Sequence, residues 1–427
     1  MAVIIAFFVL LLLGIPISMV VLGASTLGVI LYSGTPLQIV VQQMFSGLNN
    51  YVLLAVPLFI ISGTIASKGS TAKYLTEVMT IIFGRMRGGT VIAAIASCTF
   101  FAAISGSSFA TIVAIGSIML PALKEQEYPD RLAVGSICSG GSIGVLIPPS
   151  APMIALCVAL GSSVGRQFMA GVIPGIILAL AWGVYTYIVC AKNHYGKPVR
   201  YSFAEARGII LKAIPSLLYP VIVLGSIYGG LATPTESAAI SIVYVVLIEL
   251  FVYKTAKPKD LFNAFKGSLV NSAGITFIIS ASQLLTWFIT TQRLPALISE
   301  WIVTTITSPE LFLLVIIAIF FVAGCFMELV ALMVILGPIL APTLSSYGID
   351  PIHFGIVCVM AAQVSYITPP FGMNLFVTMN MTKRGLGDVA RSSLPFLIIL
   401  IVCMFLMAYV PQLSLWLPNM MMGAAVV

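Results

Sequence analysis

The sequence predicts an all-α polytopic membrane protein whose two halves form an inverted repeat. Of its 427 residues 60% are hydrophobic and 8% are charged, whereas about a quarter of the residues of a soluble domain are charged. The doublet Pro148-Pro149 recurs as Pro369-Pro370, 221 residues later (369 − 148 = 221), and each doublet lies inside an apolar segment. Proline removes a backbone donor and restrains the residue before it, so neither segment can be helical throughout.

Other residues follow nearly the same offset, which indicates that most of the chain is duplicated. Pro121 matches Pro342 at 221, and residues 59–62 (Phe-Ile-Ile-Ser) match residues 277–280 at 218. A pair of interrupted hydrophobic segments at equivalent places in two halves is typical of the binding site of a secondary transporter.

The basic residues orient the chain in the membrane. All of the 20 Lys and Arg residues except Arg166 and Arg293 lie in five polar connections. Such clusters mark cytoplasmic loops, and they lack the interleaved aromatic residues of a nucleic-acid surface, so no nucleic-acid partner is expected. The five connections are residues 68–89, 124–131, 192–212, 254–266 and 383–391.

The N-terminal part is expected to cross the membrane three times. Residues 3–32 are apolar but are interrupted by Gly14-Ile15-Pro16, which splits them into two crossings, and residues 51–67 form the third. Residues 33–50 are expected to form a short interfacial helix. Residues 70–87 carry apolar side chains at helical spacing among charged ones, so this helix is expected to lie in the interface plane.

A re-entrant hairpin and a broken helix are expected next. Residues 90–123 form an apolar segment longer than the about 20 residues that one crossing needs, and basic residues flank both of its ends. Both ends are therefore expected to be cytoplasmic, with residues 104–108 (Ile-Ser-Gly-Ser-Ser) at the tip of the hairpin. The broken helix spans residues 131–160, and a crossing at 168–190 returns the chain to the cytoplasm.

The second half repeats this order, but its hairpin is expected to enter from the outside. Residues 310–344 are interrupted at 324–328 (Gly-Cys-Phe-Met-Glu) and have no basic residue at either end. Two hairpins that enter from opposite faces give the inverted topology of secondary transporters. Residues 233–236 (Thr-Pro-Thr-Glu) have the pattern of a capping box at a helix start. The remaining expected elements are crossings at 213–230, 237–253, 269–290 and 394–416, interfacial segments at 258–266 and 292–309, and a broken helix at 351–382.

The first hairpin tip combines side-chain hydroxyls with free backbone groups. Helix ends leave carbonyl and N–H groups unpaired, and the serines of residues 105–108 add hydroxyls. Oxygen ligands without a carboxylate fit Na⁺ better than Ca²⁺, which usually recruits Asp or Glu. The alternative is that these serines only cap their own helices. The candidate cation ligands of this half are Ser105, Gly106, Ser107, Gly140, Gly144, Val145 and Pro148.

The second tip carries Met327 and Glu328 where the first has two serines. Glu328 is the one acidic residue that the expected topology places deep in the membrane, where ionisable groups are usually functional. It could be a cation ligand, a proton site or the cap of a helix. The candidate ligands of a second cation site are Gly324, Cys325, Met327, Glu328, Ser365 and Thr368.

Enzymatic chemistry is not expected. The spans show no paired carboxylates, no histidine cluster and no nucleophile beside a base. The seven cysteines have no CxxC spacing and the two histidines lie in separate loops, so no transition-metal centre is expected. No phosphate-binding GxxxxGK[ST] motif occurs; the energy for transport would come from an ion gradient or from another chain.

Four motifs resemble the large membrane subunit of tripartite ATP-independent periplasmic (TRAP) transporters, and the resemblance covers essentially the whole chain. It implies an elevator-type transporter of the bacterial inner membrane with Na⁺ at two sites. It also implies a small four-helix membrane subunit and a periplasmic substrate-binding protein that delivers an organic acid. The motifs are Ile104-Ser-Gly-Ser-Ser108, Gly140-Gly-x-x-Gly-x-Leu-Ile-Pro-Pro-Ser150, Ala232-Thr-Pro-Thr-Glu-Ser-Ala-Ala239 and Ile367-Thr-Pro-Pro-Phe-Gly-Met-Asn374.

The same resemblance implies a division of the chain into scaffold, arm and transport segments. The organic acid would be a C4-dicarboxylate or, as the favoured choice, a sialic acid. A stand-alone ion-coupled organic-anion symporter or exchanger of related two-hairpin fold remains the alternative. The implied substrate-binding residues are Ser107, Ser108, Ser150, Met327, Glu328, Asn374 and Thr378; for Asn374 a buried side chain satisfied by protein partners is an equal alternative. The implied segments are scaffold and interfacial arm 1–67, arm helix 68–89, transport 90–167, scaffold 168–291, arm helix 292–309, transport 310–382 and C-terminal helix 383–427.

Overall fold

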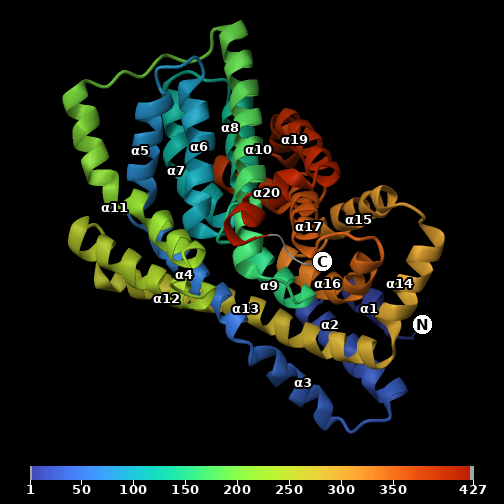
Figure 1. Ribbon diagram of the computed structural model, residues 1–427. Helices are drawn as coiled ribbons and strands as arrows, with labels where there is room; N and C mark the ends of the chain where they lie inside the picture. Colours follow the sequence, from blue (N-terminus) through green and yellow to red (C-terminus); the bar gives the residue numbers. More distant parts are fainter. Residues whose placement is uncertain (1, 424–427) are drawn as a thin grey trace.

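The computed structural model describes residues 2–423, and within that range every regular element is a helix (Figure 1). Residue 1 and residues 424–427, at the ends of the first and last expected segments, lie outside the described residues. Among the described residues, eight helices are long and apolar enough to cross a membrane. The expected all-α polytopic class is confirmed.

The N-terminal part forms the predicted pair of apolar helices, a short helix that packs against α13, and a longer span. Pro16 precedes the second helix and separates it from the first. The elements are α1 (Ala2–Leu12), α2 (Ile17–Gly28) with its π-helical continuation η1 (Val29–Ser33), α3 (Gln38–Leu48), the 3₁₀ turn η2 (Tyr51–Leu54), α4 (Ala55–Lys68) and α5 (Thr71–Phe83).

The first hairpin and the first broken helix occur where the sequence predicts them. The chain reverses at Gly106 and Ser107, inside the predicted tip, and the helix that follows is interrupted before Ser150. The elements are α6 (Gly89–Ser105), α7 (Ser108–Glu125), α8 (Asp130–Ser142), the 3₁₀ turn η3 (Ile143–Val145), α9 (Ala151–Leu160) and α10 (Val164–Asn193).

The second half repeats the hairpin and the broken helix. Its tip lies between Gly324 and Leu329, and its broken helix is interrupted between Tyr366 and Met373. The elements are α11 (Phe203–Tyr228), α12 (Pro234–Leu247) with its π-helical continuation η4 (Ile248–Val252), α13 (Pro258–Thr291), α14 (Leu294–Thr305), α15 (Pro309–Gly324), α16 (Leu329–Ser346), α17 (Pro351–Tyr366), α18 (Met373–Thr382), α19 (Leu386–Tyr409) and α20 (Gln412–Met422).

Helix boundaries differ from the prediction mainly in this half. α11 begins at Phe203 rather than at 213, because Ser202 and Glu205 form a capping box inside the basic loop. α13 is one helix over 258–291, whereas the sequence analysis placed an interfacial segment at 258–266 and a crossing at 269–290. The capping box predicted for residues 233–236 is confirmed at the start of α12.

The two halves are interleaved. α4 packs against α12 and α13, and α13 packs against α2 and α3. The second arm of each hairpin packs against the distal piece of the other half's broken helix, α7 on α18 and α16 on α9. In Figure 1 the long helix α10 separates α5, α6 and α7 on one side from α15, α17 and α19 on the other. The hairpins and broken helices are therefore held in one interlocked group.

Candidate functional site

The tip of hairpin 1 is a small cluster of oxygen atoms. Ser105 Oγ lies 2.8 Å from Thr111 Oγ1, which donates to the Ser107 carbonyl at 2.8 Å. Ser105 Oγ also lies 3.3 Å from that carbonyl oxygen. Ser107 has an extended backbone, and its Oγ accepts the Ala110 N–H at 3.4 Å, so its hydroxyl caps α7. Two hydroxyls and one carbonyl thus converge at the start of α7.

This tip touches the broken helix of its own half through glycines. A Cβ added to Gly144 would lie 2.7 Å from the Ser107 carbonyl oxygen, and one added to Gly106 would overlap the Pro149 carbonyl oxygen. Gly106 has φ 58°, a conformation that glycine adopts without strain. The backbone of the tip therefore lies against the backbone of the break.

Other candidates of the first break already have protein partners. The Gly140 carbonyl accepts the Ile143 N–H. The Val145 carbonyl accepts the Ser150 hydroxyl at 2.7 Å, and Ser150 is fully buried. The peptide bond between Pro148 and Pro149 is cis. The structure thus brings Gly144 and Pro149 to the tip, and it places Gly140 one helical turn away from Gly144.

At the tip of hairpin 2, the side chain of Glu328 caps the helix that follows. Glu328 Oε2 accepts the Val330 N–H at 3.0 Å and the Ala331 N–H at 3.3 Å, so the carboxylate caps α16. A Cβ added to Gly324 would overlap Ser365 Oγ on the second broken helix. The second tip therefore also contacts the break of its own half, and the capping role considered for Glu328 is present.

The hydroxyls of the second break bond to their own helix. Ser365 Oγ donates to the Ala362 carbonyl and Thr368 Oγ1 donates to the Val364 carbonyl, both at 2.6 Å. Cys325 Sγ contacts the Phe321 carbonyl at 3.3 Å. Met327, half-buried, lies in the turn that precedes Glu328. Of these side chains Ser365 lies beside Gly324 of the tip, and no bond joins the hydroxyls of Ser365 and Thr368 as one joins Ser105 and Thr111 at the first tip.

Asn374 joins the two halves. Its Oδ1 accepts the Ser108 hydroxyl at 2.6 Å, and its Nδ2 donates to the Cys138 carbonyl at 3.2 Å. Asn374 is fully buried, and so is Thr378 one turn later, whose Oγ1 has no hydrogen-bond partner among the described residues. Asn374, a predicted substrate candidate of the second half, therefore contacts the first hairpin, a juxtaposition that the sequence analysis did not foresee.

A second bond between the halves lies at equivalent positions. Gln363 Nε2 donates to the Ser142 carbonyl at 2.8 Å across a separation of 221 residues. The same offset relates the two proline doublets, so these residues are repeat equivalents. Two equivalent points can meet only where the pseudo-twofold axis relating the halves passes between them. The broken helices therefore meet at the centre of the repeat.

The two breaks differ in exposure. Pro148 and Pro149 are buried, whereas Pro369 and Pro370 are exposed. Phe326 at the second tip and Phe371 at the second break are 60% and 53% exposed, and their ring centroids lie 5.4 Å apart. The second tip and break are therefore the more open of the two sites.

Sequence reasoning missed three buried polar residues. Thr111 stands one turn after Ser107, and this spacing could have placed its hydroxyl at the tip. Gln363 stands one turn before the second break. Glu249, fully buried at the end of α12, escaped notice because the nearby lysines place it beside a polar loop. None of the three lies in a motif that the sequence analysis used.

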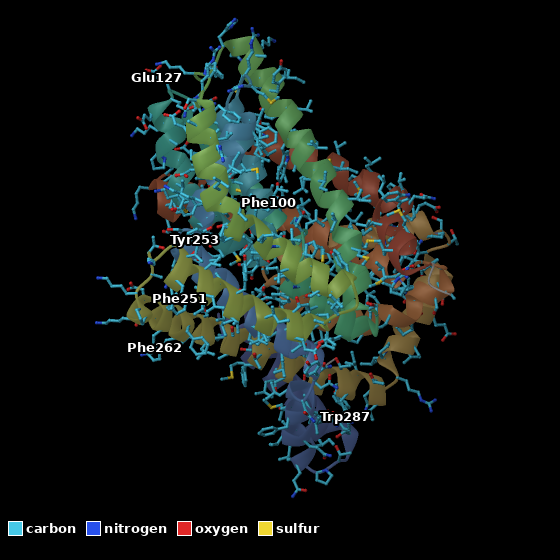
Figure 2. The ribbon with its side chains drawn as sticks, turned by 60° about the vertical axis from the view of Figure 1, so that its left-hand side comes forward. Phe100, Glu127, Phe251, Tyr253, Phe262 and Trp287 are labelled. Atoms are coloured by element: carbon cyan, nitrogen blue, oxygen red, sulfur yellow. The ribbon has the colours of Figure 1, made fainter. Side chains whose placement is uncertain are left out.

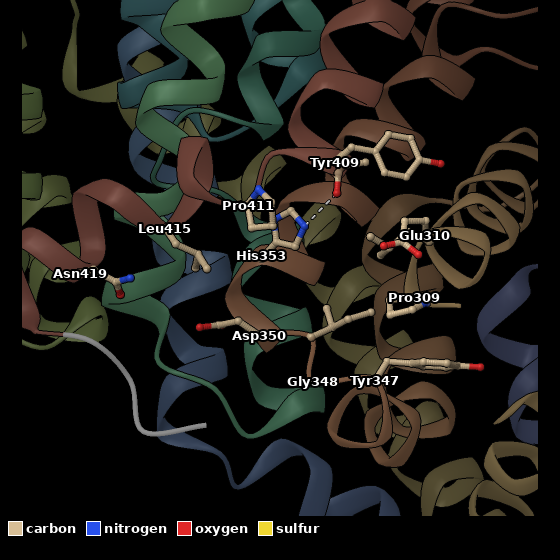
Figure 3. A pocket seen from close by; sticks show the side chains of 13 residues that line it. Pro309, Glu310, Tyr347, Gly348, Asp350, His353, Tyr409, Pro411, Leu415 and Asn419 are labelled. Atoms are coloured by element: carbon tan, nitrogen blue, oxygen red, sulfur yellow. Dashed lines mark hydrogen bonds between the residues drawn. The ribbon is translucent and has the colours of Figure 1, made fainter. Parts of the chain in front are cut away.

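A separate pocket lies where α15, α17 and α20 approach one another (Figure 3). It has a volume of about 430 Å³ and includes Glu310, Asp350 and His353 in its lining. His353 Nδ1 lies 2.9 Å from Ser414 Oγ, and its Nε2 lies 3.2 Å from the Ala408 carbonyl oxygen. This pocket contains none of the predicted site residues.

No group of three or more His, Cys, Asp or Glu side chains that could hold a metal ion occurs among residues 2–423. All seven cysteines are buried and unpaired. The polar groups that converge at the tips are hydroxyls, carbonyls, one carboxylate and one amide. Such a set suits a monovalent cation and a small polar solute better than a transition metal.

Comparisons with known proteins agree with this architecture. The chain is 40% identical over 403 residues to the C4-dicarboxylate TRAP transporter large permease protein DctM of Pseudomonas aeruginosa, covering 93% of each chain. It is 30% identical over 410 residues to the sialic acid TRAP transporter large permease protein SiaM of Vibrio cholerae, covering 96% of each.

A solved structure shares the fold, and a family model covers most of the sequence. The structure of the YdaH transporter of Alcanivorax borkumensis matches with a TM-score of 0.64 at 13% identity, over 89% of this chain and 88% of that one. The family model of the DctM component of tripartite ATP-independent periplasmic transporters matches residues 4–413. This chain therefore belongs to the DctM family, the large permease subunits of TRAP transporters.

Proposed function

We propose that this permease subunit imports an organic acid in symport with Na⁺. The observation that carries the proposal is the oxygen cluster of the first tip, formed by Ser105, Thr111 and the Ser107 carbonyl. It faces Gly144 and Pro149 of the broken helix, so the hairpin and the break approach one cation position from two sides. Bound Na⁺ would supply positive charge there and tie the two elements together.

A second cation position is proposed at the other tip. Glu328 already caps α16 through Oε2, and capping is compatible with a ligand role for its remaining oxygen. The carboxylate favours a cation, and the carbonyls around the second break supply further oxygens. The proposed ligands are the residues predicted for this site, Gly324, Cys325, Met327, Glu328, Ser365 and Thr368.

The substrate is proposed to bind between the first hairpin and the second broken helix. Ser108 and Asn374 already bond across that boundary, and Thr378 adds an unpartnered hydroxyl. Hydroxyl and amide donors suit a carboxylate. The 40% identity to a C4-dicarboxylate permease, against 30% to a sialic acid permease, supports a C4-dicarboxylate over the sialic acid favoured from the sequence.

The mechanism is proposed to be of the elevator type in the bacterial inner membrane. The hairpins and broken helices, residues 90–167 and 310–382, pack on one another and would move as one body. The remaining segments would form the scaffold, with the arm helices at 68–89 and 292–309 as connections. Sliding of this body against the scaffold would expose the site to each face in turn, which an inverted repeat makes possible.

Two protein partners are part of the proposal. A small membrane subunit would complete the scaffold, and a periplasmic binding protein would deliver the substrate. The outer surface expected to receive that protein includes the pocket with Glu310 and Asp350 (Figure 3). Two carboxylates there suit a basic patch on the partner.

Reconstitution in liposomes tests the proposal. The two membrane subunits are assayed for uptake of labelled succinate and of labelled N-acetylneuraminate under an inward Na⁺ gradient, with and without the co-encoded binding protein. We expect uptake of one acid only when both the gradient and the binding protein are present. Uptake that needs the gradient but not the binding protein would favour the stand-alone symporter. Uptake without any gradient would overturn the symport.

A further inference from the structure

Glu249 is a buried carboxylate of the second half that holds the start of α5 in the first half. It lies in η4, at the end of α12, and is fully buried. Its Oε2 accepts the Ser70 N–H at 2.9 Å, and its Oε1 accepts the Thr71 N–H at 3.0 Å. Ser70, the N-cap residue of α5, makes no capping bond with its own side chain. The cap of α5 is therefore supplied by a residue far away in the sequence.

Two hydroxyls complete the surroundings of this carboxylate. Thr71 Oγ1 donates to Oε1 at 2.7 Å, and Thr255 Oγ1 donates to Oε2 at 3.1 Å. A carboxylate offers about four acceptor positions, so the four hydrogen bonds use its capacity. No Lys or Arg of the described chain forms an ion pair with Glu249. The positive end of the α5 dipole thus compensates the negative charge.

Gly69 has no side chain, and this leaves room for the carboxyl group of Glu249. This glycine has φ −91° and ψ −165°, an extended conformation open to any residue. A Cβ at this position, however, would overlap the carboxyl group of Glu249. The approach of that side chain, rather than the backbone conformation, accounts for the glycine.

An aromatic contact supports the same junction. The rings of Tyr74 in α5 and Tyr253, just after η4, have centroids 4.6 Å apart. Figure 2 labels Phe251 and Tyr253 at this end of α12. The start of α5 is therefore fixed to α12 by a polar contact and an apolar one.

The equivalent junction in the second half is built differently. η1 and η4 are both π-helices, they follow α2 and α12, and they lie 219 residues apart (248 − 29 = 219). The position equivalent to Glu249 is Ile30 (249 − 219 = 30), which has no acceptor in its side chain. The bond found there, from Gln292 Nε2 to the Tyr32 carbonyl, is 3.3 Å long and exposed. One junction has a buried carboxylate with four hydrogen bonds, and the other has a single amide.

We propose that Glu249 is a positioning residue that keeps the N-terminus of α5 fixed to α12 while hairpin 1 moves. α5 packs along α6, the first arm of that hairpin, so a fixed start of α5 provides a pivot for it. The junction between α13 and α14 has no such anchor and bends during the same movement. The role in movement rests on the proposed transport function, whereas the anchor itself does not.

Hydrogen exchange of the purified membrane complex tests the anchor. In Glu249→Gln one of the two acceptor oxygens is replaced by an NH₂ group, which cannot accept a hydrogen bond from the backbone N–H that faces it. The backbone amide hydrogens of the first turn of α5, residues 70–74, should therefore exchange with solvent at least tenfold faster. Glu236→Gln, at the opposite end of α12, is the matched control and should affect only the start of α12, where Glu236 forms an exposed capping box. Unchanged exchange at the start of α5 in Glu249→Gln would overturn the anchor.

Uptake in liposomes tests the role in movement. Per folded molecule, Glu249→Gln should lower the maximal rate at least threefold, with unchanged substrate and Na⁺ concentrations for half-maximal uptake. Faster exchange with an unchanged maximal rate would overturn the pivot. Because exchange is measured without transport, a wild-type complex that takes up nothing would count against the proposed function alone.

A second variant covers the case in which Glu249→Gln yields little folded protein. Gly69→Ala should also speed exchange at the start of α5, because its Cβ displaces the carboxyl group. In the Glu249→Asp background the shorter side chain withdraws from that Cβ, so Gly69→Ala should lose most of its effect. Strictly additive effects of the two changes would show that they do not act through one contact and would contradict the anchor.

Discussion

The serines of the first tip have different hydrogen-bond partners in the structure. These partners distinguish a helix-capping role from a cation-binding role, which the sequence alone does not. Ser107 Oγ caps α7, whereas Ser105 Oγ bonds the Thr111 hydroxyl and the backbone of Ser107. A hydrogen-bonding group that contacts a charge contributes about 1.5–3 kcal/mol, so Ser105→Ala should raise the Na⁺ concentration for half-maximal uptake roughly tenfold. Ser107→Ala should instead cost about 1 kcal/mol of stability and leave that concentration unchanged, because its carbonyl is retained.

Uptake titrated against Na⁺ and normalised to folded protein measures both effects. Ser117→Ala is the control, because Ser117 lies on the exposed face of the same helix and bonds only the Ala114 carbonyl. A titration of Ser105→Ala that overlays the wild type would remove Ser105 from the cation site.

Loss of Asn374 should weaken the contact between the first half and the second broken helix. Asn374→Ala leaves the Ser108 hydroxyl and the Cys138 carbonyl without their partner in a buried place. Each unsatisfied buried group costs about 1–3 kcal/mol, so thermal unfolding should occur at a clearly lower temperature. Asn193→Ala, an exposed asparagine that bonds only the Val189 carbonyl, is the control. Similar shifts for the two variants would argue against a bridging role.

At the scale of elements, the close approach of hairpin 1 to the first break depends on Gly144. Gly144→Ala would place a methyl group 2.7 Å from the Ser107 carbonyl oxygen, and the hairpin would have to move away. We expect Na⁺-dependent uptake to fall at least tenfold, a loss of roughly 1.4 kcal/mol or more. Gly183→Ala is the control, because its Cβ would meet only Ile92, at 3.9 Å. Normal uptake by Gly144→Ala would show that the tip and the break need not touch.

The interruptions of the helices were predictable because their causes are local. Glycines, prolines and serines at 104–108, 140–150 and 367–374 break a helix whatever surrounds them, and the structure places the first tip and both breaks there. The start of α11 was missed for a similar local reason, because the capping box of Ser202 and Glu205 begins the helix inside a polar stretch that charge counting had assigned to a loop. For α13 the predicted start was right, but the helix continues through residues 266–269, where the sequence analysis had separated an interfacial segment from a crossing.

Contacts between the halves could not be predicted from the sequence. The bonds from Ser108 to Asn374 and from Gln363 to Ser142 join residues more than 200 positions apart, and no local pattern marks them. Glu249 is a similar case, because its partners at the start of α5 are 178 and 179 residues away. Only the packing of one repeat on the other brings such groups together.

For the whole molecule, the inverted repeat predicts that equivalent loops lie on opposite faces of the membrane. Cysteines introduced by Arg200→Cys, in the basic loop, and by Thr307→Cys, before hairpin 2, are both at exposed positions. A membrane-impermeant thiol reagent should label the first only from the cytoplasm and the second only from outside. The native cysteines are buried and give a low background. Labelling of both positions from one face would contradict the inverted topology.

The bond between Gln363 and Ser142 has a consequence for how such a protein can arise. In a dimer of identical half-length chains, one residue type would face its own copy across the symmetry axis. With identical residues at both positions, each copy would direct the same side chain at the backbone carbonyl of the other. The space at the axis holds only one such side chain. When the two copies are joined in one chain, the two positions can differ. Here one is Gln363, whose long side chain donates, and the other is the small residue Ser142, whose carbonyl accepts. The centre of the repeat is thus where a covalently joined pair can become asymmetric and an assembly of two identical chains cannot.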